Sequence, residues 1–193
     1  MPINKVAGLH FTIPVAHGKQ RFRELIVYAS KKSAQDPYFG TIKLNKILYY
    51  SDFRAYEHLG QPITGMVYFR LAHGPAPKAL ASVRRELQEE GAIRIARLNI
   101  GQYVEDRTIA LREPYLSLFT EDELRIVDTV IDELWPQNAM EVADASHDMR
   151  WRTLRDGDLL PYEFAFLDDR ITEDDISRGD ELARKLGWRT AGK

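Results

Sequence analysis

The segment RLAHGPAPKAL, residues 70–80, holds the histidine that is best placed for chemistry. His73 follows an apolar stretch and precedes a helical pattern. A catalytic histidine needs a carboxylate that orients it or a nucleophile that it serves, and Asp52 is an upstream carboxylate. The other interpretation is a rigid turn, because the glycine after His73 has a free φ angle and the two prolines have fixed ones. We favour the turn, since the sequence has no GxSxG motif and structural histidines outnumber catalytic ones.

Asp52 is the second candidate, because it lies at the edge of the apolar stripe of a predicted helix, on the same side as Asn45. A carboxylate at such a position must be paired or hydrogen-bonded. It is either a catalytic base with a perturbed pKa or a structural tie to a loop N–H or a basic side chain. We predict the structural tie, with Asp52 and the HGPAP turn acting together as scaffold.

Metal and phosphate chemistry find little support in the sequence. The five histidines, at positions 10, 17, 58, 73 and 147, show no HxxxH or HxxE spacing. The absence of cysteine excludes disulfides, thiolate zinc sites, iron–sulfur clusters and cysteine nucleophiles. No GxxxxGK[ST] phosphate loop occurs. We therefore expect no metal site, no cofactor and no enzymatic activity.

The overall composition is that of an ordinary globular protein of 193 residues, with 44% hydrophobic and 29% charged residues. The formal net charge is −2, whereas a general nucleic-acid binder is basic. The N-terminal residues contain no long apolar run, and no stretch is long enough to span a membrane. The expected location is the cytoplasm. A local basic surface stays open as an alternative, with Arg84, Arg85, Arg94 and Arg97 as candidate phosphate contacts.

The elements that must position these residues are mostly helical. Hydrophobic periodicity and capping patterns predict helices at about 18–33, 41–59, 77–90, 121–135, 138–149 and 172–187. Two strands of a hairpin are predicted at 92–98 and 107–113. The predicted fold is mainly α with a small antiparallel β-hairpin, a single helical domain with a winged-helix-like element. We divide the chain into an N-terminal lead (1–17), a helical domain (18–167) and a C-terminal helical extension (168–193).

The predicted helix 41–59 is apolar over more than half of its circumference, which places it at the centre of the domain. One apolar stripe consists of Leu44, Leu48, Ser51, Ala55 and Leu59. On the opposite side the pattern puts Lys43, Lys46, Tyr50, Arg54 and Glu57, which we expect to form a solvated face.

Three stretches together resemble a known family: TIKLNKILYYSDFRAYEHLGQPITG, then YFRLAHGPAPKAL, then SHDMRWR followed by LLPYE. They are similar to the Panacea-domain proteins, the SocA-like antitoxins of bacterial and phage toxin–antitoxin systems. The family's motif residues correspond to Lys43, Leu44, Lys46, Leu48, Tyr49, Tyr50, Asp52, Gly60, Pro62, Gly65, Tyr68, Gly74, Pro75, Pro77, Ser146, His147, Trp151 and Tyr162. The resemblance covers about residues 20 to 165, and we expect these motif residues to be structural.

The resemblance implies an antitoxin that neutralises a cognate protein toxin by direct binding. Two alternatives stay open: a DNA-binding autoregulator that uses the winged-helix-like element on operator DNA, and an adaptor that hands its partner to a ClpXP-type protease. Interface hot spots favour aromatic residues. Our candidate anchors are Tyr38, Phe39, Tyr103, Tyr115 and Trp188, while Trp151 fits core packing better.

Overall fold

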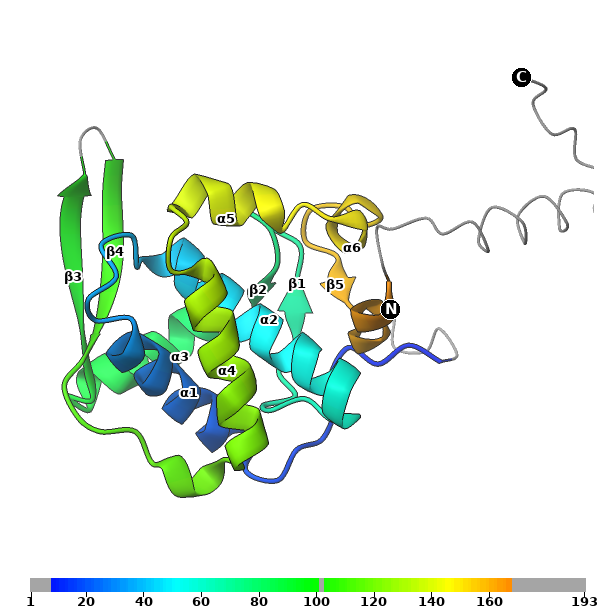
Figure 1. The fold of residues 1–193 in the computed structure, drawn as a ribbon, viewed down its shortest axis with the longest axis horizontal. Coiled ribbons are helices and arrows are strands. Elements are labelled where there is room, and N and C mark those ends of the chain that lie inside the picture. Colours follow the sequence, from blue (N-terminus) through cyan, green and yellow to red (C-terminus); the bar gives the residue numbers. More distant parts are fainter. Residues whose placement is uncertain (1–7, 101–102, 168–193) are drawn as a thin grey trace, which may run out of the picture.

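The computed structural model describes residues 8–100 and 103–167, and within them the fold is mainly helical, as predicted (Figure 1). The helices are α1 (Gly18–Lys32), α2 (Thr41–Leu59), α3 (Leu80–Glu89), α4 (Glu121–Leu134), α5 (Ala139–Ala145) and α6 (Met149–Arg152). Two short 3-10 helices lie at Leu116–Leu118, before α4, and at Tyr162–Phe166, after β5. The predicted helix at 172–187 lies outside the described residues.

Two small antiparallel sheets accompany the helices. In the first, β1 (Tyr68–Phe69) lies between β2 (Ala76–Pro77) and β5 (Leu159–Leu160). The second is the predicted hairpin, in which β3 (Ile93–Ile100) pairs with β4 (Tyr103–Ala110) and projects beyond the helices (Figure 1).

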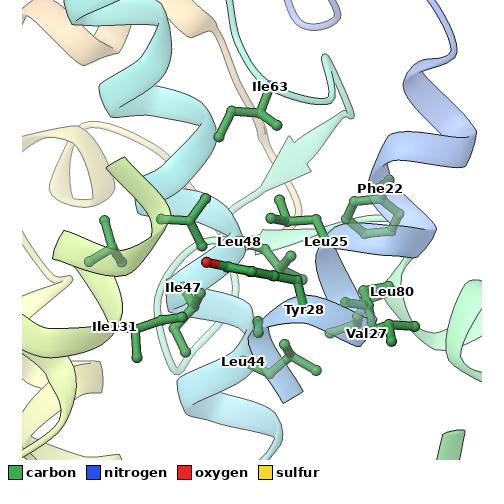
Figure 2. Close-up of a cluster of buried hydrophobic side chains, with 14 of the residues drawn as sticks. Phe22, Leu25, Val27, Tyr28, Leu44, Ile47, Leu48, Ile63, Leu80 and Ile131 are labelled. Atoms are coloured by element: carbon green, nitrogen blue, oxygen red, sulfur yellow. The ribbon is translucent and has the colours of Figure 1, made fainter. Parts of the chain in front are cut away.

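Helix α2 lies at the centre, and α1 and α4 pack against it. Figure 2 shows side chains of α1, such as Leu25 and Tyr28, meeting Leu44 and Leu48 of α2, with Ile131 of α4 beside them. The C-terminal half of α2 adds a second, aromatic cluster that contains Tyr49, Phe53, Tyr68 and Tyr162. The apolar circumference of α2 is therefore used on more than one side, which explains its central place.

Helix starts follow the predicted caps where a capping box is present. The Thr120 side chain accepts from the Glu123 backbone and the Glu123 side chain accepts from the Thr120 backbone, and Asn138 with Glu141 does the same for α5. Gly60 ends α2 in the left-handed conformation with φ 74°.

Several predicted boundaries were wrong, among them the end of the second hairpin strand, which lies at Ala110 and not at residue 113. Helix α3 begins at Leu80, because Pro77 pairs with Tyr68 in the small sheet instead of starting the helix. Strand β4 begins at Tyr103, four residues before the predicted start, because the ladder continues to the pair Ile100–Tyr103. The helix predicted at 138–149 ends at Ala145, and Asp148 caps the separate helix α6 by accepting from the Trp151 N–H at 3.2 Å.

The described part of the N-terminal lead is bound to the domain. The Thr12 hydroxyl donates to the Gly65 carbonyl at 2.8 Å, and the His10 N–H donates to Glu163 at 2.8 Å. Gly65 has φ 70°, and a Cβ there would collide with the Ile13 carbonyl, so the family's glycine permits this close approach. The boundaries after residues 17 and 167 stay predictions.

Candidate functional site

Asp52 lies at the centre of a buried polar cluster. Its Oδ1 accepts from the Thr64 N–H at 2.7 Å, and its Oδ2 accepts from the hydroxyls of Thr64, Tyr68 (2.8 Å) and Tyr162 (3.3 Å). Burial raises the pKa of Asp52, and these hydrogen bonds act in the opposite direction. Asp52 thus has the predicted tie to a loop N–H, but the loop is the one at Thr64 and not the HGPAP turn.

The HGPAP turn is held by Lys46 instead. The Lys46 ammonium donates to the Pro75 carbonyl at 2.8 Å, and burial lowers the pKa of Lys46 to about 7. Gly74 has φ 87°, and a Cβ there would meet the Ser146 Oγ and come within 2.6 Å of the Lys46 Nζ. The turn therefore packs directly on α2 and on the end of α5, in a space that only glycine fits.

A stack of three side chains joins the segment 70–72 to α6. The ring centroids of His147 and Trp151 lie 3.9 Å apart, and the Arg70 guanidinium lies over the Trp151 ring, 3.7 Å from its centroid. The Trp151 Nε1 donates to the Leu71 carbonyl at 2.8 Å, and the His147 Nε2 lies 3.1 Å from the Ala72 carbonyl. His147 and Trp151 therefore contact the backbone carbonyls of the segment 71–72 and hold it against α6.

His73, the first candidate for chemistry, makes no contact with these groups. The residue is exposed, and no hydrogen bond joins it to another residue of the described chain. Asp52 lies at 0% exposure within its cluster, so the two residues do not form one site. In residues 8–100 and 103–167, no group of three or more histidine, aspartate or glutamate side chains could hold a metal ion.

The prediction of a solvated lysine face on α2 was wrong, because Lys43 and Lys46 are each only 1% exposed. The Lys43 Nζ lies 2.7 Å from the Asp36 Oδ2 and donates to the Trp135 carbonyl at 3.2 Å. A carboxylate in the preceding loop thus allows a charged lysine to be buried.

The remaining motif residues also serve packing. Leu44 lies in the main core. The Tyr49 and Phe53 rings pack at a tilt with centroids 4.6 Å apart, and the ring of the half-buried Tyr50 lies 4.9 Å from that of Tyr49. The motif residues of the described chain therefore include two buried polar centres on α2, one at Asp52 and one at Lys46.

The candidate anchors divide into exposed and buried residues. Tyr38 is 50% exposed and Tyr115 is 57% exposed, so both are accessible to a partner. Phe39 is 1% exposed and was wrong as an anchor, because the loop turns its ring inward under Arg107. The side chain of Tyr103 and the whole of Trp188 lie outside what the structure describes, and Trp151 is half-buried in its stack.

Sequence reasoning missed two exposed leucines beside Tyr115. Leu111 is 55% exposed and Leu116 is 46% exposed, so residues 111–116 present three large apolar side chains, which we call the 111–116 surface. Leu111 falls within the predicted strand 107–113, and Leu116 lies in a segment for which no helix or strand was predicted. The charged sequence around them, with Arg112 and Glu113, is the signal that could have identified a surface segment.

The four candidate DNA contacts do not form one patch. Arg84 is 7% exposed and donates to the Thr41 hydroxyl at 3.1 Å, so its assignment as a phosphate contact was wrong. Arg85, Arg94 and Arg97 are exposed, but Arg94 and Arg97 lie at positions of opposite parity on β3 and thus on opposite faces of the hairpin.

Comparison with known families gives a match over the central part of the chain. The model described as antitoxin SocA-like, Panacea domain, matches residues 44–152, which is more than half of the chain. No curated protein and no solved structure matches the chain. Among the described residues, no helix combines the length and the apolar character that crossing a bilayer requires.

Proposed function

Because the chain belongs to the SocA-like antitoxin family with a Panacea domain, we propose that it neutralises a cognate protein toxin by binding to it directly. The family match over residues 44–152 is the observation that carries the proposal. It also favours a role without catalysis. The buried state of Asp52 and the separation of His73 from it agree with such a role, since reactants cannot reach a carboxylate at 0% exposure.

The 111–116 surface supports a binding role. The Glu24 carboxylate is 3% exposed and accepts from the Arg112 guanidinium at 2.6 and 2.7 Å and from the Tyr115 N–H at 2.9 Å. The Arg112 guanidinium lies 4.6 Å from the Tyr115 ring. These contacts hold the exposed tyrosine in place, so a partner that buries it loses little conformational entropy.

The experiment that tests the proposal is expression of the neighbouring open reading frame with and without this protein. The expected result is that the neighbour alone stops growth, that co-expression restores it, and that the two proteins co-purify. A neighbour that does not affect growth, or rescue without a complex, contradicts direct neutralisation.

Two matched variants sharpen this test. Tyr115→Ala removes an aromatic anchor and should weaken the complex by about 1–2 kcal/mol, while the chain melts at the wild-type temperature. Met140→Ala changes a residue on α5 of similar exposure (64%, against 57% for Tyr115) and should leave the affinity unchanged. If Tyr115→Ala and Met140→Ala bound the toxin with equal affinity, the interface would not include the 111–116 surface. A gel shift with the protein's own promoter at low salt tests the DNA-binding alternative on the same preparation.

A further inference from the structure

The two edges of the β3–β4 hairpin have different surroundings. The edge of β4 lies against the helices: the Thr41 hydroxyl donates to the Asp106 carbonyl at 2.8 Å, and the Arg107 guanidinium donates to the Ala34 carbonyl at 2.8 Å. In Figure 1, β3 is the outermost strand and its other edge faces away from the helices. The hairpin therefore offers one long open edge.

The register identifies which backbone groups face that open edge. The Leu111 N–H donates to the Ala92 carbonyl at 2.9 Å, so hydrogen-bonded pairs alternate from there and include the pair of Ala96 with Arg107. The N–H and C=O groups of Ile95 and Arg97 consequently point outward, away from β4. Within the described residues no hydrogen bond reaches these outward groups. An eight-residue strand with such an edge is a template for one more strand.

The side chains at this edge select the partner strand by charge. Arg94 is exposed and makes no ion pair with a described residue. Arg97 has a side chain that is 75% exposed, and its only ion pair in the described chain, to Asp106, is 3.4 Å long. Because the two arginines lie on opposite faces of β3, a strand added here meets a cation on both faces.

This arrangement disfavours a second copy of the chain and favours an acidic partner. A second β3 would bring the same two arginines to the ladder, where like charges destabilise pairing. It also fits DNA poorly, since Glu105 and Asp106 on β4 lie opposite Leu98 and Arg97 and repel phosphate. An extended segment with carboxylates on both faces matches the edge, and Leu98, at 37% exposure, adds an apolar contact near its end.

We propose that the toxin binds by adding an extended, carboxylate-bearing strand to the open edge of β3. This docking mode rests on the proposed function, because it requires that the chain bind a protein partner at all. It adds a second contact region to the 111–116 surface and specifies the chemistry of the partner there: main-chain hydrogen bonds to Ile95 and Arg97, and carboxylates facing Arg94 and Arg97.

The first experiment measures the affinity of the full chain for the product of the neighbouring open reading frame. The double variant Arg94→Glu with Arg97→Glu should weaken binding by about tenfold or more, because it reverses the charge of both faces of the edge. Arg152→Glu, a reversal of an exposed arginine on α6, is the matched control and should bind as the wild type does. Arg97→Pro should bind more weakly than Arg97→Ala, since proline also removes an outward N–H without touching the ladder to β4.

The second experiment follows amide hydrogen exchange with and without the partner. The amides of Ile95 and Arg97 should exchange rapidly in the free chain and become protected in the complex, while the ladder amide of Ala96 is protected in both. Protection of Ile95 and Arg97 in the free chain overturns the proposal, because the edge would already be occupied. A complex in which these amides stay unprotected also overturns it.

The two levels of the proposal fail in distinguishable ways. If the wild type binds and neutralises the partner while the charge-reversed and proline variants bind within about twofold of it, strand addition is wrong and the antitoxin function stands. If the wild type does not bind the partner, both are wrong. If the charge reversal abolishes promoter binding and leaves partner binding unchanged, the edge is a nucleic-acid contact and the proposal is overturned.

Discussion

Lys43 and Lys46 lie three residues apart on α2 and are equally buried, yet the protein accommodates them by different means. Lys43 is paired with the Asp36 carboxylate at 2.7 Å. Lys46 has no carboxylate within ion-pair distance in the described chain and donates to the Pro75 carbonyl, and burial lowers its pKa to about 7. The charge of the buried Lys43 is balanced by its counter-ion, whereas burial favours the neutral form of Lys46.

The comparison predicts the largest effect at the paired lysine. Asp36→Ala leaves the Lys43 ammonium buried without its counter-ion and removes the acceptor of the Tyr38 N–H, so the free energy of unfolding should fall by about 3–5 kcal/mol. Urea denaturation measures this. Replacing the pair together, Asp36→Leu with Lys43→Met, should restore most of the loss.

An exposed pair provides the control for this prediction. Asp122 and Arg125 are joined at 2.8 Å on α4, with side chains 62% and 71% exposed. Asp122→Ala should cost under about 1 kcal/mol. If Asp36→Ala lowered the free energy of unfolding no more than Asp122→Ala does, the Asp36 carboxylate would not be what stabilises the buried Lys43. The proposed difference between Lys43 and Lys46 would then be wrong.

A second prediction concerns the space beside Lys46. Gly74→Ala forces a side chain into a left-handed residue and against the Ser146 Oγ and the Lys46 Nζ, and it should cost about 2–3 kcal/mol. Gly157 has nearly the same conformation, φ 86°, but a Cβ there meets nothing within 4 Å. Gly157→Ala should therefore cost only the backbone strain, about 1 kcal/mol. Thermal melts of the two variants compare them directly, and equal losses would show that Gly74 is not crowded.

The contrast between these lysines also shows what the sequence can predict. The extent of α2, the hairpin and the two capping boxes follow from local periodicity and from residue pairs three positions apart, and all were predicted. Burial of Lys43 and Lys46 depends on partners seven and twenty-nine residues away, which a helical pattern does not contain. The pattern therefore assigned both lysines to solvent.

The candidate site shows the same limit. The family motif identified Lys43, Lys46 and Asp52 as a group, because a motif is defined by residue types and their spacing in the sequence. It did not show that Asp52 bonds to Thr64, since the loop that brings Thr64 to it closes only in the folded chain. Phe39 and Arg84 were misassigned for a related reason. Phe39 lies under Arg107 of β4 and Arg84 donates to Thr41 at the start of α2, and a local sequence pattern contains neither contact.

The last and smallest prediction is the pH dependence that Lys46 imposes. Its pKa is about 7 in the folded chain and near the ordinary 10.5 when unfolded, so between these values the unfolded state binds more protons and stability rises with pH. The half-buried Tyr50 acts oppositely at high pH, because burial raises the pKa of Tyr50 to about 12 and the unfolded chain then loses its proton first. The useful window is therefore pH 7.5 to 9, where the wild type should gain about 1–2 kcal/mol.

The variant Lys46→Met should lose this rise, because it has no amine to deprotonate. At pH 7.5 its stability should lie within about 1 kcal/mol of the wild type, since the lost hydrogen bond to the Pro75 carbonyl offsets the removal of a poorly solvated amine. Lys78→Met, at an exposed position, should keep the wild-type dependence. Urea denaturation across the window measures all three chains. Parallel curves for the wild type and Lys46→Met would mean that Lys46 stays charged, and that it differs from Lys43 only in its partner.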